Sequence, residues 1–325
     1  MKYFIVFFIL AFRSIQLLLI FGTEQVFGLG VQQQDDRANF VQYQNITGNG
    51  SAFTSILDLP YDDENPSILT SLDVHMPTSD SILPIVFFIH GGGWSAGDKG
   101  GLAHVNKRDF FIDNGFVFVS TNYRLAPDVA FPVYPQDVAK AFVKIVDTVA
   151  DYNGNVNEIF ILGHSAGAHL GAILSLDQDY LHDFGSYAQF IQGVILLDGS
   201  GYDIPFIIDY NIQTGNQTIL DIYHTAFGQD TALWELASPI SHIDAMKVPP
   251  FQLFYVNTHI LSSLTSARLY QQFIDNNHSV QRTAVFNSSH ALINRNFGTN
   301  DDEVAPQALA FINSIRDFIF VNGFD

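Results

Sequence analysis

The stretch IFILGHSAGAHLGAIL, residues 159–174, decides which fold class this chain can adopt. Its first four residues are apolar and predict a buried strand, while the residues after Ser165 predict a helix. Small residues flank Ser165 in the Gly-x-Ser-x-Gly motif of residues 163–167, and they allow a strand to turn sharply into a helix that passes close to it. We therefore predict that the hydroxyl of Ser165 projects from the carboxyl edge of a sheet, beside the backbone N–H of Ala166.

A second glycine-rich stretch, HGGGW at residues 90–94, follows the apolar run 83–89. Consecutive glycines after a strand let main-chain N–H groups approach a ligand without obstruction by side chains. Such amides stabilise the negative charge that develops on an attacked carbonyl oxygen. We therefore predict an oxyanion hole formed by the amides of Gly92, Gly93 and Ala166.

Together these motifs resemble the α/β-hydrolase superfamily, in particular its HGGG-type esterase and lipase branch. The resemblance rests on residues 90–94, on NYRLAP at residues 122–127 and on residues 163–167, with His290 later in the chain. It implies a doubly wound, mostly parallel α/β sheet with helices on both faces and a small excursion after the sixth core strand. The longer run GHSAGAHL, residues 163–170, also looks like the corresponding turn of arylformamidases.

The rest of the chain has the alternation of strands and helices that such a sheet requires. Further strands are predicted at residues 69–76, 82–89, 115–120, 193–197, 251–256 and 280–286, and the uninterrupted apolar run at 115–120 is typical of a strand buried on both faces. Apolar residues at helical spacing predict helices at residues 134–152, 264–274 and 302–320. Residues 199–243 have no clear period, and we expect either a small cap over the active site or a packed connection without substrate contact.

Composition limits the classes of protein and partner. With 325 residues, of which 47% are hydrophobic, the chain can bury a large core, and we expect one domain at residues 51–325. The formal net charge of -19 argues against nucleic-acid binding and against attraction to anionic membranes. The chain has no cysteine, which excludes disulfides, thiolate metal sites and a cysteine nucleophile.

The first residues predict export. Residues 1–28 begin with Lys2 and continue as an apolar run that Arg13 interrupts, which is typical of a signal peptide of a secreted or periplasmic protein. The alternative is a retained anchor, and membrane association is expected only in that case. The polar residues 29–50 predict a flexible lead-in.

A serine nucleophile needs a base, and His290 is the predicted one because it follows the last predicted strand. His278 precedes that strand and would lie at the opposite edge of the sheet. His90, His164 and His169 lie near the two glycine turns, where we expect them to hold loops by hydrogen bonds or to belong to the core.

The acid of the triad is less clear from the sequence. The resemblance implies a carboxylate after the strand 251–256, but residues 257–260 are NTHI and no acidic residue follows before Asp275. Asp198, at the end of the preceding predicted strand, is our candidate because some lipases of the superfamily take their acid from that strand. Asp203 is a second candidate. The alternative is that Asp198 braces the turn while Asn257 orients His290.

The expected function is a secreted serine hydrolase that cleaves small-molecule carboxylic esters through an acyl-enzyme, with Ser165, His290 and Asp198 as catalytic residues. The alternatives are an arylformamidase-like amide hydrolase and a noncatalytic binding protein with the hydrolase fold. We expect no metal or organic cofactor, because this chemistry needs none. The acidic clusters at residues 35–36, 62–64 and 301–303 are expected to be solvated loops.

Overall fold

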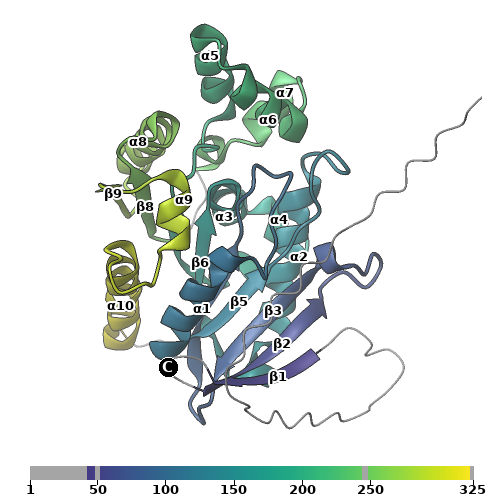
Figure 1. Ribbon diagram of the computed structural model, residues 1–325, viewed down its shortest axis with the longest axis vertical. Helices are drawn as coiled ribbons and strands as arrows, with labels where there is room; N and C mark the ends of the chain where they lie inside the picture. The colour runs from purple at the N-terminus through teal and green to yellow at the C-terminus, as the bar shows by residue number, and fades with distance from the viewer. Residues whose placement is uncertain (1–41, 48–51, 244–247, 323–325) are drawn as a thin grey trace, which may run out of the picture. The chain divides into compact units, whose positions relative to one another are not determined.

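A computed structural model describes residues 42–47, 52–243 and 248–322, which form a nine-stranded sheet with helices on both faces (Figure 1). The strand order is β1-β2-β3-β5-β4-β6-β7-β8-β9. The strands are β1 (Gln42–Thr47), β2 (Ala52–Pro60), β3 (Ser71–Pro77), β4 (Leu83–Ile89), β5 (Val117–Thr121), β6 (Gly154–His164), β7 (Ile191–Leu197), β8 (Phe251–Val256) and β9 (Val280–Val285).

Strands β4 to β9 pair in parallel, and the first three strands add antiparallel pairs at one edge. The predicted doubly wound, mostly parallel sheet is therefore confirmed. Because parallel strands all run in one direction, β4, β6, β7, β8 and β9 deliver the residues after them to the same edge of the sheet. The predicted site residues follow these strands.

Alternate side chains of each central strand enter two separate cores. In β4, Phe87 and Ile89 pack on one face and Val86 and Phe88 on the other, and all four are buried. Continuous apolar sequence is the signature of a strand covered on both sides. The first face is covered by α2 (Val133–Thr148), α3 (Ala166–Leu176), α4 (Asp179–His182) and α8 (Ile260–Asp275). The second is covered by α1 (Leu102–Asp113), α9 (His290–Arg295) and α10 (Val304–Asn322).

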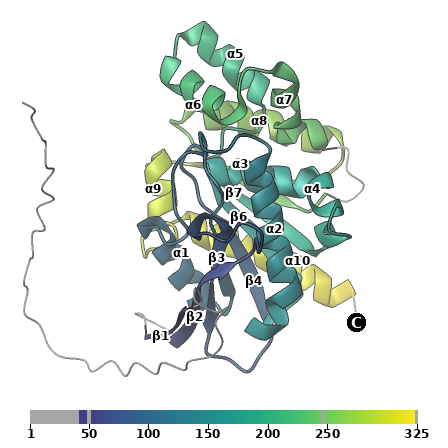
Figure 2. The ribbon, with the colours of Figure 1, turned by 90° about the vertical axis from the view of Figure 1, so that its right-hand side faces the viewer.

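The excursion after β7 is helical. Residues 199–243 contain α5 (Ile204–Thr214), α6 (Gln217–Phe227), α7 (Thr231–Leu236) and the 3-10 turn Pro239–His242. The three helices lie together beyond one end of the sheet in both views (Figures 1 and 2). Each has at most 11 residues and starts at a side-chain cap, so its apolar period covers few turns and is hard to recognise in the sequence.

The first described strand lies within the predicted lead-in, residues 29–50. Residues 42–47 of the predicted lead-in form β1, which pairs antiparallel with β2. An edge strand is held by backbone hydrogen bonds and does not need an apolar sequence, which is why this segment was predicted to be flexible. Residues 1–28, the predicted leader, lie outside the described residues. Among the helices that are described, none combines the length and apolarity needed to cross a bilayer.

Candidate active site

Ser165 lies on the turn between β6 and α3, with φ of 55° and ψ of -119°. The turn is so tight that a Cβ atom on Gly163 would lie 2.3 Å from the carbonyl oxygen of Gly167. A Cβ on Gly167 would lie 2.1 Å from the carbonyl oxygen of Ile89. Only glycine fits at these two positions, and this explains why the Gly-x-Ser-x-Gly pattern predicts the position of Ser165.

The structure brings His290 and Asp198 to this serine. His290 begins α9, directly after the loop that follows β9, and its Nε2 lies 2.9 Å from Oγ of Ser165. Its Nδ1 lies 2.8 Å from Oδ2 of Asp198, the residue that follows β7. Asp198 is fully buried, and its Oδ1 accepts a hydrogen bond of 2.8 Å from the amide of Val256. The three side chains thus have the contacts of a Ser-His-Asp triad.

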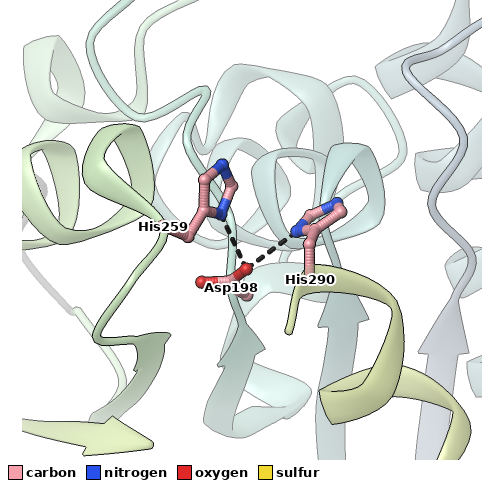
Figure 3. Close-up of side chains that lie close together, drawn as sticks. All are labelled: Asp198, His259 and His290. Atoms are coloured by element: carbon pink, nitrogen blue, oxygen red, sulfur yellow. Dashed lines mark hydrogen bonds and ion pairs between the residues drawn. The ribbon is translucent and has the colours of Figure 1, made fainter. Parts of the chain in front are cut away.

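A second imidazole, that of His259, also contacts Asp198. Its Nδ1 lies 2.7 Å from Oδ2, the same oxygen that His290 contacts (Figure 3). His259 follows β8, on the loop where the family resemblance implied the acid. Sequence reasoning treated this residue only as a departure from the pattern and gave it no role. The sequence signal for His259 is its position after β8, the strand that pairs with β7.

The environment keeps Asp198 ionised. Burial by itself would raise the pKa of this carboxyl. The hydrogen bonds from His259 and His290 and the one from the amide of Val256 outweigh that effect and hold the pKa of Asp198 well below its usual range. A carboxylate is therefore available at neutral pH to orient His290.

The other candidates for acid and base lie elsewhere. Asp203 caps α5 by accepting the amide of Phe206, and its Oδ2 lies 2.7 Å from Nε of Arg268. Asn257 is exposed, and among the described residues its side chain has no hydrogen bond with His290. His278 precedes β9 and its Nε2 contacts the carbonyl oxygen of Ile243 at 3.1 Å. Asp203 and His278 thus have structural contacts away from Ser165.

The glycine loop after β4 is tightly folded. Gly92 has φ of 120°, and a Cβ there would lie 2.0 Å from the carbonyl oxygen of Ala96. Gly93 has φ of 60°. Among the described residues, the amides of Gly92, Gly93 and Ala166 donate to no protein group. These three predicted donors line one cavity together with Ser165, where a substrate oxygen can accept from them.

Three further histidines hold the loops around the site. His90 stacks on Tyr123 with ring centroids 4.4 Å apart, and the Tyr123 hydroxyl donates to the carbonyl of His90. His164 donates from Nε2 to the carbonyl oxygen of His290 at 2.9 Å, so it positions the loop that carries the predicted base. Burial lowers the pKa of His164 to about 3, which keeps this ring neutral.

His169 connects the glycine loop to the helical excursion. Its Nδ1 accepts from Nε1 of Trp94 at 3.1 Å, and its Nε2 donates to the carbonyl oxygen of Ala237 at 2.7 Å. Burial lowers the pKa of His169 to about 4, so the ring is neutral and can have both roles. One buried imidazole therefore joins three segments that are far apart in the sequence.

A cavity of about 770 Å³ opens above Ser165. Its lining includes His259, His290 and the glycine loop, and it also includes apolar residues. Ile219, Ile222 and Tyr223 belong to α6, so the excursion reaches the cavity. A cap over the active site and a packed connection without substrate contact both stay predictions for residues 199–243, and the lining by α6 supports the cap.

Two of the acidic clusters have structural contacts. Asp62 pairs with Nζ of Lys140 at 2.7 Å and accepts two nearby backbone amides. Asp302 accepts the amides of Val304 and Ala305 at the start of α10. Residues 35–36 lie outside the described residues.

Comparisons with known proteins agree with the fold and the motifs. The sequence profile of a family described as BD-FAE matches residues 72–273. The probable carboxylic ester hydrolase LipM of Mycobacterium tuberculosis is 28% identical over 209 residues, which are 62% of this chain and 46% of that protein. The kynurenine formamidase of Salmo salar is 29% identical over 160 residues, 48% of this chain and 49% of that protein. The chain therefore spans about half the length of these curated relatives.

Solved structures have the same fold. A truncated carbohydrate esterase from gut microbiota has a TM-score of 0.67 at 16% identity, over 84% of this chain and all of that one (100%). Esterase B from Lactobacillus rhamnosis has a TM-score of 0.65 at 19% identity, over 85% of each chain. At such identities these structures establish the fold alone, and the fold is that of the α/β hydrolases expected from the motifs.

Proposed function

The chain belongs to the BD-FAE family, and from this premise we propose that it is a serine hydrolase of carboxylic esters. The observation that carries the proposal is the chain of contacts from Ser165 Oγ to His290 Nε2 at 2.9 Å and from His290 Nδ1 to Asp198 Oδ2 at 2.8 Å. A hydroxyl attacks a carbonyl only when a neighbouring base accepts its proton. These contacts support a role for His290 as the base that accepts the Ser165 proton and for Asp198 as the carboxylate that orients this base.

The mechanism follows from these contacts. His290 Nε2 accepts the Ser165 proton as Oγ attacks the ester carbonyl, and the amides of Gly92, Gly93 and Ala166 stabilise the oxyanion. The imidazolium, stabilised by Asp198, then donates its proton to the departing alcohol. Water, deprotonated by the same imidazole, attacks the acyl-enzyme and releases the acid and the free serine.

The substrate is a small-molecule ester with an apolar part. The esterases among the relatives support this class of substrate. The cavity of about 770 Å³ has the size of a small-molecule site and has Trp94, Ile222 and Leu261 in its lining. Apolar groups of the acyl or alcohol part pack against these residues while the ester carbonyl faces the glycine loop.

The direct test compares the wild type with Ser165→Ala on short-chain nitrophenyl esters. Removal of the nucleophile should lower kcat by about 10³-fold or more. A fluorophosphonate should label the wild type and Ser200→Ala, because the Ser200 hydroxyl bonds to that of Tyr223 and to no imidazole. Equal hydrolysis by Ser165→Ala would contradict the role of Ser165 as nucleophile. A wild type that neither hydrolyses the esters nor is labelled at Ser165 would favour a noncatalytic binding protein.

A second activity, hydrolysis of an arylformamide, is supported by the run at residues 163–170 and by the formamidase relative. The same triad can cleave an amide if His290 protonates the departing amine. Turnover of N-formylkynurenine by the wild type, compared at equal enzyme concentration with a nitrophenyl ester, decides between the two substrates. Absence of turnover on the formamide would leave the ester.

We further propose that residues 1–28 direct export of the protein, as a cleaved signal peptide or as a retained anchor. The apolar run after Lys2 supports this location. Fractionation of expressing cells and sequencing of the mature N-terminus would test it. A protein found within the cell with all of these residues would argue against export.

A further inference from the structure

We propose that Asp198, His259 and His290 together form a site for a divalent transition-metal cation such as Zn²⁺, and that the bound cation reversibly blocks the hydrolase. One nitrogen of each imidazole and one carboxylate oxygen all lie within 4.8 Å of one another, and the Nδ1 atom of each ring contacts Oδ2 of Asp198. Two imidazole nitrogens and a carboxylate oxygen are a donor set that Zn²⁺ takes in proteins. Tetrahedral ligands about 2.1 Å from a zinc ion lie about 3.4 Å apart, so small side-chain movements are sufficient.

The three groups converge from separate strand ends (Figure 3). Asp198 follows β7, His259 follows β8 and His290 follows the loop after β9. The carboxylate cannot turn away, because its Oδ1 is held by the amide of Val256 while Oδ2 faces both rings. A ligand fixed by such a contact costs little to organise when the metal binds.

A cation from solvent can reach this site. The side chains of His259 and His290 are 28% and 43% exposed, and both line the cavity above Ser165. Asp198 is fully buried behind them. The cation therefore enters from the cavity and binds on the inner side of the two rings, and water from the cavity supplies the fourth ligand.

Binding changes hydrogen positions without adding or removing a net proton. In the free site each ring carries its hydrogen on Nδ1, which donates to Asp198. On binding, each ring moves this hydrogen to Nε2 by exchange with water, and the Nδ1 lone pair coordinates the metal. The Nε2 of His290 then carries a hydrogen and cannot accept the proton of Ser165.

His259 distinguishes this site from a triad with a single imidazole, because it adds a second nitrogen ligand. A triad with a single imidazole offers one nitrogen and one oxygen, whereas this site offers a second nitrogen at 2.7 Å from the same carboxylate oxygen. His242 is a matched control, since its Nδ1 lies 3.7 Å from Oδ2 of Asp177 and no second imidazole of the described residues joins this pair in a group of possible metal ligands.

The experiment uses the purified full chain, treated with chelator and then titrated with ZnCl₂ by calorimetry and in the nitrophenyl ester assay. The wild type and His242→Asn should bind one Zn²⁺ tightly and be inhibited reversibly, with activity recovered by chelator. In His259→Asn, whose amide can still donate to Asp198, binding and inhibition should weaken at least about 10-fold. MgCl₂, which prefers oxygen ligands, should not inhibit at the same concentration.

Inhibition is expressed relative to the metal-free rate of each variant. Equal Zn²⁺ affinity in the wild type and in His259→Asn would overturn the proposal. A wild type that binds no Zn²⁺ in the calorimetric titration would also overturn it. Circular dichroism checks that the variant is folded, and His259→Gln replaces it if it is not. The inhibition rests on the proposed function, whereas the binding does not. A His259-dependent site in a protein without esterase activity would therefore leave the metal site standing and remove the proposed function.

Discussion

His259 and His290 donate from their Nδ1 atoms to one oxygen, Oδ2 of Asp198, at 2.7 and 2.8 Å. A carboxylate oxygen has more than one lone pair, so it can accept both. The contact with His290 orients the predicted base toward Ser165. The contact with His259 supports the carboxylate from the other side and joins the loop after β8 to the site. We therefore expect different effects on kcat from replacing Asp198 and from replacing His259.

The first prediction concerns Asp198→Asn. The amide cannot stabilise an imidazolium and favours the wrong tautomer of His290, so kcat should fall by about 10³- to 10⁴-fold. Steady-state kinetics on a nitrophenyl ester measure the change. The control is Asp203→Asn, which can still cap α5 but removes the charge that pairs with Arg268, and it should lower Tm slightly while largely preserving kcat. A loss of less than about 10-fold in Asp198→Asn would contradict the assignment of the acid.

The second prediction is that His259 is a positioning residue that acts through Asp198. His259→Phe keeps a ring but has no donor for Oδ2, and kcat should fall by about 10- to 100-fold, as when an outer partner of a site is lost. KM should change little, and His259→Asn, which keeps a donor, should recover part of kcat. If His259→Phe and His259→Asn had the same kcat as the wild type, the contact with Asp198 would have only a structural role.

The sequence was sufficient for the parts of the site that depend on local geometry. Ser165 and the glycine loop stand at turns where a Cβ would collide with backbone, and glycine patterns record such constraints. The central strands were equally clear, because a strand buried on both faces must be apolar throughout. Short helices such as α7 and the edge strand β1 lack these signals, and the sequence did not reveal them.

The acid could not be chosen from the sequence because the choice depends on which strand ends meet. Strands β7 and β8 are neighbours in the sheet, so a residue after either strand can approach His290. The carboxylate stands after β7, as Asp198, and an imidazole stands after β8, as His259. Spacing along the chain does not distinguish this arrangement from its alternatives, and only coordinates reveal that both side chains share one oxygen.

The third prediction concerns the glycine loop. In Gly92→Ala the new Cβ would lie 2.0 Å from the carbonyl oxygen of Ala96, so the loop must move and the predicted amide donors with it. Loss of one such donor lowers kcat by about 10²- to 10³-fold. Gly215→Ala is the matched control, since Gly215 also has positive φ, 69°, but no atom within 4 Å of a Cβ. It should lose stability and retain kcat; equal kcat in both variants would argue against the oxyanion hole.

The fourth prediction concerns Lys107, which lies on α1 and is fully buried. Its Nζ donates to the carbonyl oxygens of Ala103, at 2.9 Å, and Asn294, the residue near the end of α9. Burial lowers the pKa of Lys107 to about 7. In the unfolded chain the pKa of a lysine is about 10.4, so between these values the unfolded state binds a proton that the native state has released.

The contribution of Lys107 to the free energy of unfolding must therefore rise with pH above about 7, by at most about 1.4 kcal/mol per pH unit. Urea unfolding of the wild type and of Lys107→Met at about pH 7, 8 and 9 gives the free energy of unfolding of each protein. The contributions of the other titrating groups are the same in both proteins, so they cancel when one free energy is subtracted from the other. The wild type should gain stability relative to Lys107→Met as the pH rises. The control is Lys144→Met, which removes a lysine of α2 instead. A constant difference between the wild type and Lys107→Met would mean that Lys107 keeps its proton in the folded protein.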